Sequence, residues 1–567
     1  MTKRVVVASG YFNPLHYGHV SYLEKARDLG TSLIVIVNND LQAEKHRKDG
    51  AAMRLPARER VKLVRSLQCV DAAVEAIDED ESVAETLRVL HPDIFANGGG
   101  QKPTEQEFKV CSELGIQMVD GLGIQLLSLT PYTQHYDWGK PRNESIIAAL
   151  TGQQSPENDK EGDKPFAELW MGDHPSGPAR VQSPSGKDAP KKKIPRSSSL
   201  QEVMHRSPSM LGQLSETKQL PFLLKVLSIH KALSIQAHPD KTRAAKLHAE
   251  RPEVYKDSNH KPEIAIALSD DFQALCGFRI VPEFLQMLEH VPELAALLGP
   301  ERVAELRASI GDEEKETEAL RQAYYKLMHV SEDDMKQQVQ LLHARAKKAT
   351  MNYGYPANEQ LPHNVEDCFS LVCKLYEQYQ EDIGIFSVFF MNYVRMNVGE
   401  CLYMAQNVPH AYISGDIVEC MACSDNVVRG GLTPKFKDVD VLCEMLNYRG
   451  GPPASLKPTE VEKGILLYAD PDIQEFQVTH MTIDAGGERR WLFSSEGPAM
   501  ALNLSGCGTV IISGEVQEMT PGKVFMLAAG AEPELHAKTK MEIFVACCPP
   551  EFFKSPSPSP TVTAKKW

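Results

Sequence analysis

A single short stretch, Leu233–Lys241 (LSIQAHPDK), constrains this chain more than any other. Its polar and apolar residues alternate, a pattern that predicts a β-strand with Gln236 and His238 pointing to the same side. A carboxylate, Glu263, returns after an Asp-Ser-Asn turn, and His410 follows much later in NVPHAY. Amide oxygen, imidazole and carboxylate donors suit Zn²⁺, which in catalytic sites leaves one position open for water or substrate. Taken alone, a Gln-x-His pair on a strand is more often an ordinary polar face than a metal site.

The length and composition indicate a multidomain globular protein. The 567 residues predict several domains, at roughly 150 residues each. A net charge of −15 argues against a nucleic-acid partner, which would require a basic face. The 12 cysteines lie in no disulfide-like spacing, which fits a reducing compartment, and Cys420 and Cys423 are interpreted as buried small side chains. There is no signal-peptide pattern and no apolar run near about 18 residues, so a cytoplasmic protein without a membrane partner is the expectation.

Long sequence blocks surround the candidate metal ligands, and their resemblance to a known family favours a metal site over an ordinary polar face. They are QHYDWGK (134–140), KPFAELWMGDHP (164–175), PFLLKVLSIHKALSIQAHPDK (221–241), NHKPEIAIAL (259–268), LCGFR (275–279), NVPHAY (407–412) and VECMACSDNVVRGGLTPKF (418–436). In these blocks and their order, the chain from about Leu127 to its C-terminus resembles type I phosphomannose isomerases. The resemblance implies a zinc enzyme that interconverts mannose 6-phosphate and fructose 6-phosphate, and so supplies the precursor of GDP-mannose. It also implies that the zinc ligands are Gln236, His238, Glu263 and His410.

The implied reaction moves a proton between C1 and C2 of the open sugar through a cis-enediol. The bound Zn²⁺ would orient two sugar oxygens and stabilise the negative charge that forms. Two residues are rival candidates for the base: Lys261, whose pKa a neighbouring cation and burial would lower, and Glu419, which the resemblance places at an acid/base position. His260 is a candidate either for opening the sugar ring or for orienting a ligand.

The phosphate group of such a substrate requires fixed cations. Arg429 in VVRGG offers a planar guanidinium and Lys435 in LTPK a point charge, both at positions that the resemblance places in the substrate pocket. Ser234 and Lys225 are weaker candidates for substrate binding. The sequence leaves open which of Arg429 and Lys435 holds the phosphate and which steadies the enediolate.

The N-terminal segment predicts a strand, a helix and a second strand. Arg4–Ala8 is a compact β-branched run, apolar residues recur at helical spacing from His19 to Gly30, and Ser32–Val37 is a buried strand. In open α/β sheets of this kind, nucleotides bind at the carboxyl ends of the strands. The loop Gly10–His19, between the first strand and the helix, is therefore a candidate nucleotide site.

His16 and His19 lie on either side of Gly18, where the helix is expected to begin. Free N–H groups and the helix dipole favour a phosphate there, and two imidazoles can stabilise charge on an α-phosphate under attack. In this setting the motif resembles the cytidylyltransferase-like nucleotidyltransferases over about residues 3–125. The resemblance implies a nucleoside triphosphate with Mg²⁺ and a phosphorylated acceptor. The candidate nucleotide-binding residues are Gly10, Phe12, His16, Gly18, His19, Lys45 and Arg58.

The segment Gly121–Ser128 departs from this second family. Its members carry a late Ser/Thr-rich loop that closes over the triphosphate, and here that loop is at best degenerate. Two hypotheses follow. Either the domain is a nucleotidyltransferase, or it is a non-catalytic nucleotide-binding or oligomerisation module that regulates the isomerase or holds a homodimer together.

The predicted fold is multidomain: an N-terminal α/β Rossmann-like domain, then a β-rich cupin (jelly-roll) isomerase with an inserted α-helical domain and a C-terminal cupin-like β domain. The predicted limits are 1–125 for the nucleotidyltransferase-like domain, 126–281 and 381–456 for the two catalytic parts, 282–380 for the helices, 457–550 for the last β domain and 551–567 for a disordered tail. A Ser-, Pro-, Lys- and Gln-rich insertion at about 176–217 is predicted to be flexible. Strands are expected to resume at Ile383.

Overall fold

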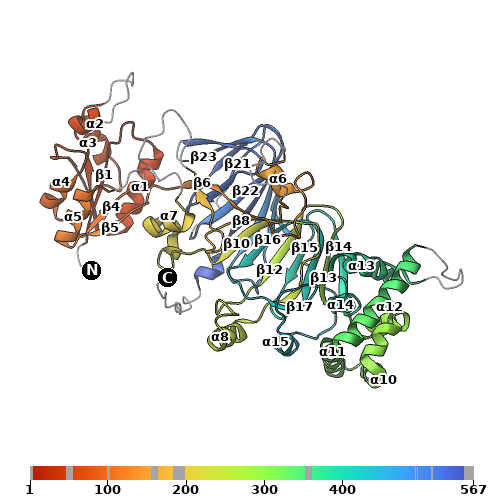
Figure 1. Cartoon of the computed structure of the whole chain (residues 1–567). Helices are drawn as coiled ribbons and strands as arrows, with labels where there is room; N and C mark the ends of the chain where they lie inside the picture. Colours follow the sequence, from red (N-terminus) through yellow and green to blue (C-terminus); the bar gives the residue numbers. More distant parts are fainter. Residues whose placement is uncertain are drawn as a thin grey trace.

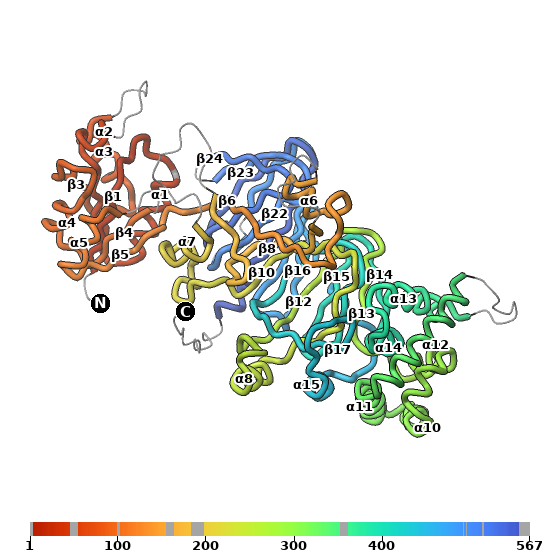
Figure 2. Tube along the Cα trace, in the orientation of Figure 1, coloured from red at the N-terminus to blue at the C-terminus, as the bar shows by residue number. Residues whose placement is uncertain are grey.

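The computed structural model describes residues 4–45, 55–98, 103–154, 164–182, 198–351, 361–491, 493–494, 496–512 and 515–554. The molecule is elongated: an α/β unit lies at one end, β-rich sheets occupy the middle and a helical layer lies at the other end (Figure 1 and Figure 2). Across these residues, no helix combines the length and apolar character needed to cross a membrane. The prediction of an α/β domain followed by β-rich regions around a helical insertion is confirmed.

The N-terminal unit is a parallel five-stranded sheet in the order β3-β2-β1-β4-β5. Its strands are β1 (Val5–Gly10), β2 (Ser32–Val37), β3 (Ala72–Glu75), β4 (Ile94–Ala96) and β5 (Gln117–Val119), and its helices are α1 (Tyr17–Asp28), α2 (Asp40–Lys45), α3 (Ala57–Arg65), α4 (Ala84–Leu90) and α5 (Glu105–Leu114). Central β1 pairs with β2 and β4, and Val6 lies opposite both Leu33 and Ile94. Because all strands run the same way, their carboxyl ends form one edge, and the loop after β1 lies on that edge.

The central region is built around one long strand, β16 (His410–Ala422). Its ten-stranded sheet also contains β7 (Tyr132–Gln134), β8 (Glu168–Met171), β10 (Phe222–Ile229), β11 (Ile235–Ala237), β12 (Glu263–Ala267), β13 (Phe272–Phe278), β14 (Met391–Met396), β15 (Cys401–Met404) and β17 (Val428–Gly431). The helices α6 (Ile146–Leu150) and α8 (Lys241–Glu250) connect strands of this sheet, and α15 (Val439–Met445) follows β17. Because β16 pairs with β10, β11, β12 and β13, one strand fixes the positions of residues that are far apart in the sequence.

A helical layer covers one end of this sheet (Figure 1). It consists of α9 (Val281–His290), α10 (Pro292–Ser309), α11 (Glu313–Met328), α12 (Glu332–Thr350), α13 (His363–Tyr379) and α14 (Gly384–Phe390). The apolar faces of these helices share a core with Ile235 and Leu275 of the central strands. The expectation that strands resume at Ile383 is wrong, because the apolar run after it forms α14. Such a run is buried either as helix or as strand, and periodicity alone cannot separate the two.

The C-terminal β region consists of an eight-stranded and a four-stranded sheet. Its strands are β18 (Thr459–Glu462), β19 (Ile465–Tyr468), β20 (Gln477–Ile483), β21 (Glu488–Arg490), β22 (Ala499–Ser505), β23 (Gly508–Ile512), β24 (Glu515–Met519), β25 (Val524–Leu527), β26 (Glu534–Ala537) and β27 (Met541–Cys547), followed by the short 3₁₀ helix Pro550–Phe553. Two early strands, β6 (Leu126–Thr130) and β9 (Arg180–Val181), complete the larger sheet, in which β6 pairs with β25. The strand that follows the N-terminal unit is thereby fixed against the C-terminal part of the chain.

The flexible insertion predicted at about 176–217 is wrong for its second half. The helix α7 (Leu200–Arg206) and the 3₁₀ helix η2 (Pro208–Ser215) bury their apolar side chains, among them Leu211. Ser199 caps α7 in a reciprocal capping box with Glu202. Although the segment is polar in overall composition, a few of its apolar residues recur at helical spacing and pack against the core of the sheets. The start of the insertion is ordered as well, because β9 pairs with β6, whereas residues 183–197 and the predicted tail from residue 555 on lie outside the described residues.

Residues 120–125 join the N-terminal unit to the sheets. Leu122 is buried in the core of the N-terminal unit, whereas Ile124 packs against the core of the central and C-terminal strands. Gly121 lies against Ser207, where an added Cβ would come within 2.3 Å of the serine Cβ. The connection is therefore anchored on both sides, and it starts at the strand edge where nucleotides bind in folds of this kind.

Candidate metal centre and active site

Three strands bring the predicted metal ligands together. β11 carries Gln236, His238 follows its end, Glu263 opens β12 and His410 opens β16. The register of β11 and β16 places Gln236 opposite His410. The Nε2 atoms of His238 and His410 lie 3.4 and 3.5 Å from the two carboxylate oxygens of Glu263, and the Gln236 amide lies 3.5 Å from His410 Nε2. The two histidines and the glutamate are fully buried.

Backbone carbonyls orient both imidazole rings for metal binding. The Nδ1–H of His238 donates to the Asn426 carbonyl at 2.7 Å, and that of His410 donates to the Val408 carbonyl at 3.0 Å. Because a carbonyl can only accept, each ring presents an unprotonated Nε2 to Glu263. Burial also lowers the pKa of His238 to about 4, which keeps this ring neutral and able to bind a cation.

The unsatisfied atoms of this cluster fit a cation. Within the described part of the chain, His238 Nε2 and Glu263 Oε2 are buried without a hydrogen-bond partner. Acceptor atoms that face one another in this way are costly unless a cation lies between them. Two imidazole nitrogens, a carboxylate and an amide group form a set of ligands that suits Zn²⁺.

A buried row of charges continues from the ligands into the sheet. Lys261 Nζ lies 2.8 Å from Glu263, and Lys225 Nζ lies 3.0 Å from Glu419 and 3.6 Å from Glu168. Lys225 and Glu419 face each other across β10 and β16 as a cross-strand pair. Burial alone would raise the pKa of Glu263, but the Lys261 cation helps to hold it well below its usual value. Burial raises the pKa of Glu419, although Lys225 opposes the rise.

The structure places Lys261 and Glu419 in this buried row, and Ser234 close to it. The Ser234 hydroxyl lies 3.5 Å from the Gln236 amide oxygen. His260 has different neighbours, because its ring nitrogens lie 2.7 Å from Glu475 and 3.4 Å from Gln406. Its role in ring opening stays a prediction, and the observed contacts tie it to the segment before β20.

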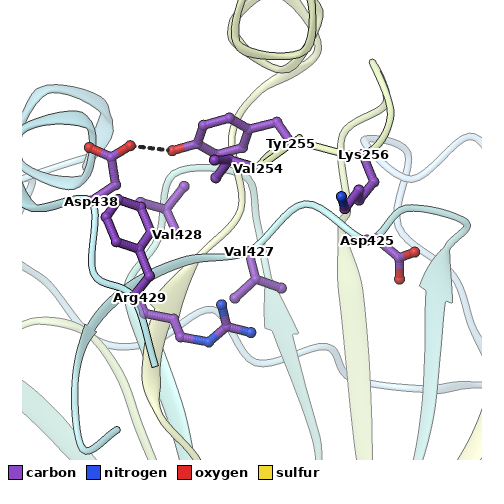
Figure 3. Close-up of a pocket in the computed structure, with 9 residues that line it drawn as sticks. Val254, Tyr255, Lys256, Asp425, Val427, Val428, Arg429 and Asp438 are labelled. Atoms are coloured by element: carbon purple, nitrogen blue, oxygen red, sulfur yellow. Dashed lines mark hydrogen bonds between the residues drawn. The ribbon is translucent and has the colours of Figure 1, made fainter. Parts of the chain in front are cut away.

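A cavity of about 280 Å³ contains Arg429 (Figure 3), which lies opposite the predicted ligand Gln236 in the register of β11 and β17. Its lining residues are Val254, Tyr255, Lys256, Asp425, Val427, Val428, Arg429, Phe436 and Asp438. Burial lowers the pKa of Arg429, but a guanidinium remains charged in proteins. Lys435 is exposed on the loop that carries Phe436 and is not among the lining residues.

Several residues around these charges were not predicted from the sequence. Trp170 Nε1 donates to Glu168, and the Lys225 ammonium lies 5.1 Å from the centre of the Trp170 ring. Asp425, on the cavity wall, lies 3.4 Å from the buried His174. Glu168, Trp170 and His174 all belong to the block KPFAELWMGDHP. The alternation of Glu168 and Trp170 on one strand was the signal that could have found them.

The loop after β1 gathers five of the predicted nucleotide-binding residues. The centres of the His16 and His19 rings lie 3.8 Å apart. Phe12 and His19 make an edge-to-face contact. Burial and the neighbouring His16 lower the pKa of His19 to about 4. Gly10 lies directly against Phe12, and Gly18 occupies the first turn of α1.

Lys45 and Arg58 do not join this group. The Lys45 ammonium donates to the Glu79 carbonyl at 2.8 Å, and Arg58 is exposed on α3. The neighbouring Arg60 is fully buried instead and donates to the Tyr11 carbonyl at 2.8 Å. Arg60 therefore holds the loop after β1 in place, a role that the sequence analysis did not assign.

The segment predicted to be a degenerate closing loop has a structural role. The amides of Leu122 and Gly123 donate to the carbonyls of Asn97 and Gly98 at 3.2 and 2.8 Å, so the chain packs against the end of β4. From Leu126 it continues as β6 into the next sheet. Residues 120–130 therefore pack against the end of β4 and connect the N-terminal unit to the next sheet.

Comparisons with known proteins match both halves of the chain. The model of the catalytic domain of type I phosphomannose isomerase matches residues 126–281, that of the helical insertion domain of the same family matches 297–391, and a cytidylyltransferase-like model matches 7–115. The chain is 37% identical to mannose-6-phosphate isomerase of Mus musculus, over 75% of this chain and 99% of the relative. It is 38% identical to mannose-6-phosphate isomerase 2 of Arabidopsis thaliana, over 76% of this chain and 96% of the relative.

Solved structures share the fold. The apo form of mannose 6-phosphate isomerase from Salmonella typhimurium has a TM-score of 0.60 at 24% identity, covering 74% of this chain and 99% of that one. A zinc-bound mannose 6-phosphate isomerase gives the same values. Together with the curated relatives, which match almost from end to end, these findings place the chain. It belongs to the type I phosphomannose isomerase family and carries a cytidylyltransferase-like domain ahead of the isomerase region.

Proposed function

We propose that this chain is a zinc-dependent isomerase that interconverts mannose 6-phosphate and fructose 6-phosphate. The observation that carries the proposal is the cluster of Gln236, His238, Glu263 and His410, in which the buried His238 Nε2 and Glu263 Oε2 have no hydrogen-bond partner among the described residues. When bound there, Zn²⁺ would supply Lewis-acid stabilisation of the oxygens of the open sugar. The curated relatives that match this part of the chain are mannose-6-phosphate isomerases.

Glu419 is the better candidate for the base, and Lys261 for a fixed positive charge. Burial raises the pKa of Glu419 toward the range that a base needs, while Lys225 at 3.0 Å favours its ionised form. We assign to the Glu419 carboxylate the proton that leaves C2 of the open aldose and returns to C1 after the cis-enediol. Lys261 is ion-paired with Glu263 at 2.8 Å, and its ammonium would donate hydrogen bonds to the sugar oxygens.

The phosphate group is assigned to Arg429, with Lys435 as a second cation. Arg429 lines the cavity next to the metal-binding strand, and its planar fork matches the geometry of a phosphate. Lys435 is exposed on the adjoining loop, where it would meet the phosphate from the solvent side. Ser234, next to Gln236, would contact the sugar, whereas Lys225 would act on Glu419.

Replacing Arg429 by alanine is expected to lower kcat/KM for mannose 6-phosphate by about 10²-fold, because a charge-assisted contact to phosphate is lost. An assay that couples fructose 6-phosphate to a dehydrogenase signal measures the change. Arg321→Ala is the control, since it removes an exposed arginine that is ion-paired with a carboxylate of its own helix, Glu318. If turnover by the Arg429 variant stays within a few-fold of the parent, Arg429 does not belong to the catalytic site.

The N-terminal domain is proposed to bind a nucleotide at the loop between β1 and α1. The observation that favours this function is the His16–His19 ring pair at the amino end of α1, where backbone N–H groups can face a phosphate. As a nucleotidyltransferase, the domain would use a nucleoside triphosphate with Mg²⁺ and a phosphorylated acceptor. The structural use of residues 120–130 favours the alternative, a nucleotide-binding or oligomerisation module that regulates the isomerase or holds a homodimer together.

Pyrophosphate release distinguishes these two functions. The purified chain would receive each of the four nucleoside triphosphates with Mg²⁺ and a panel of phosphorylated sugars and alcohols. We expect no release above that of a variant with both His16→Ala and His19→Ala, because residues 120–130, where the closing loop is expected, are bonded to the end of β4 and continue into β6. Isomerase activity in the same tube shows that both proteins are folded. Release that requires an acceptor and vanishes in the variant would instead establish a second enzyme activity.

Finer features of the chain are proposed on the same basis. The central and C-terminal β regions would be jelly rolls of the cupin type, with domain limits near residues 125, 281, 380, 456 and 550. The isomerase would work in the cytoplasm, and its mannose 6-phosphate would serve the synthesis of GDP-mannose.

A further inference from the structure

Two loops that contact each other form one wall of the cavity that contains Arg429. One loop follows α8 and spans residues 251–256, and the other spans residues 432–438 between β17 and α15. The Tyr255 hydroxyl donates to Asp438 at 2.8 Å, the contact drawn in Figure 3, and Arg251 donates to the same carboxylate oxygen at 2.6 Å. Asp438 therefore receives two hydrogen bonds from the facing loop.

Arg251 also contacts two aromatic rings. Its guanidinium carbon lies 5.7 Å from the centre of the Tyr255 ring and 5.8 Å from that of Phe436. Phe436 is 62% exposed, so these cation–π contacts hold a ring that solvent largely surrounds. Arg251, Tyr255, Phe436 and Asp438 together form what we call the latch. Because Lys435 directly precedes Phe436, the latch also holds the segment that carries this lysine.

The other end of the 432–438 loop has a separate anchor. The amide of Leu432 donates to Asp382 at 2.7 Å, and Lys437 Nζ lies 3.9 Å from the second oxygen of the same carboxylate. Lys435 lies between Leu432 and Lys437, its amide donates to the Thr433 hydroxyl at 3.1 Å, and its side chain is exposed. The Asp382 contacts and the latch therefore hold this loop together, and the latch fixes its C-terminal end at Phe436 and Asp438.

We propose that Arg251, Tyr255 and Asp438 are positioning residues for the phosphate group of the substrate. They would fix the loop so that Lys435 and Arg429 meet the phosphate from two sides of the cavity. This inference rests on the proposed isomerase function and goes beyond it. A loop that is ordered before binding does not lose conformational freedom when the phosphate arrives, which favours affinity. Loosening the latch therefore weakens binding of the phosphorylated sugar, while proton transfer in the bound sugar continues.

Tyr255→Phe is the most conservative test, because it removes the hydroxyl and keeps a ring that is 1% exposed. We expect KM for mannose 6-phosphate to rise about 5-fold and kcat to stay within about 2-fold of the parent, since the lost interaction acts on binding. Asp438→Asn, which weakens the Arg251 contact but still accepts from Tyr255, should shift KM in the same direction. A fall in kcat at constant KM would overturn the proposal.

Tyr448→Phe is the matched control. Tyr448 is a buried tyrosine of the same core, and its hydroxyl donates to the Cys443 carbonyl at 2.9 Å instead of to the loop. We expect this variant to keep the KM and kcat of the parent, with a melting temperature lowered about as much as in Tyr255→Phe. Equal increases of KM in the two variants would mean that general loosening of the core, and not the latch, sets substrate affinity, and would overturn the proposal.

A double-mutant cycle with Lys435→Ala tests whether the latch acts through this lysine. We expect the variant that combines Tyr255→Phe and Lys435→Ala to have the same KM as Lys435→Ala alone, because a latch without its lysine has nothing to position. If the two substitutions raise KM independently, so that their factors multiply in the double variant, the latch does not act through Lys435.

Calorimetric titration with mannose 6-phosphate and with mannose separates this inference from the isomerase proposal. A chain that prefers mannose 6-phosphate but does not convert it would contradict the isomerase function, and the dissociation constants of the same variants would then decide on the latch. A parent that binds neither sugar would overturn both proposals.

Discussion

His238→Ala is expected to lose zinc and isomerase activity together. The lost imidazole is fully buried, and the Asn426 carbonyl fixes its orientation, so no other side chain can move into its place. We expect kcat to fall by at least about 10³-fold, because Lewis-acid stabilisation is worth several kcal/mol and about 1.4 kcal/mol is a factor of ten in rate. Zinc content measured by plasma mass spectrometry should fall in parallel with activity.

The control for this variant is His343→Ala, which removes a histidine that stacks on Tyr376 in the helical layer. It should retain both zinc and activity. A chelator should inactivate the parent and lower its melting temperature, because a ligand that binds only the folded state stabilises it. Added Zn²⁺ should then restore the parent but not His238→Ala. Isomerase activity in a metal-free preparation of His238→Ala would contradict the assignment of this cluster as the zinc site.

Lys225→Met is expected to cost about 3–5 kcal/mol of unfolding free energy at neutral to mildly alkaline pH. The lysine side chain is 7% exposed and lies between Glu419 and Glu168, at 3.0 and 3.6 Å. Methionine keeps most of the aliphatic volume of lysine, so the loss of unfolding free energy measures the effect of the missing charge. Two buried carboxylates would then lose the cation that lies between them in a low-dielectric site, and kcat should fall as well if Glu419 is the base.

The stability lost in Lys225→Met should be larger at high pH than at low pH. Burial already raises the pKa of Glu419, Lys225 opposes that rise, and removal of the lysine raises the pKa further. A carboxyl group whose folded pKa exceeds its unfolded value binds its proton more tightly in the folded state. Its unfavourable contribution is therefore absent at low pH and grows as the pH rises above the unfolded pKa. The variant should consequently lose less stability at about pH 5 than at about pH 8.

Urea unfolding of the parent and the variant at both pH values measures this difference. Lys374→Met is the control, because it removes a half-buried lysine of α13 outside the buried row of charges. Its deficit should be small and should change little with pH. An equal deficit for Lys225→Met at the two pH values would show that the packing of the lysine, and not its charge, stabilises the sheet.

Some features of this protein were determined by sequence alone. The alternation around Gln236 and His238 was enough to put both side chains on one side of a strand, because this follows from strand geometry in any fold. The parallel β1-α1-β2 start followed from periodicity and from the glycine that ends the helix. The family resemblance then supplied the more distant partners Glu263 and His410, which spacing could not connect.

Other features were decided only by the tertiary structure. Lys225 meets Glu419 because β10 and β16 pair in one particular register, and nothing near either residue encodes that register. The latch joins Tyr255 and Asp438 for the same reason, since two loops from distant parts of the chain meet only after the sheet has formed. α14 and α7 were also mispredicted from local composition, which favoured a strand for α14 and no structure for α7. In both segments burial of apolar side chains stabilises a helix instead. Local patterns act over a few residues, whereas register and burial are set by packing of the whole domain.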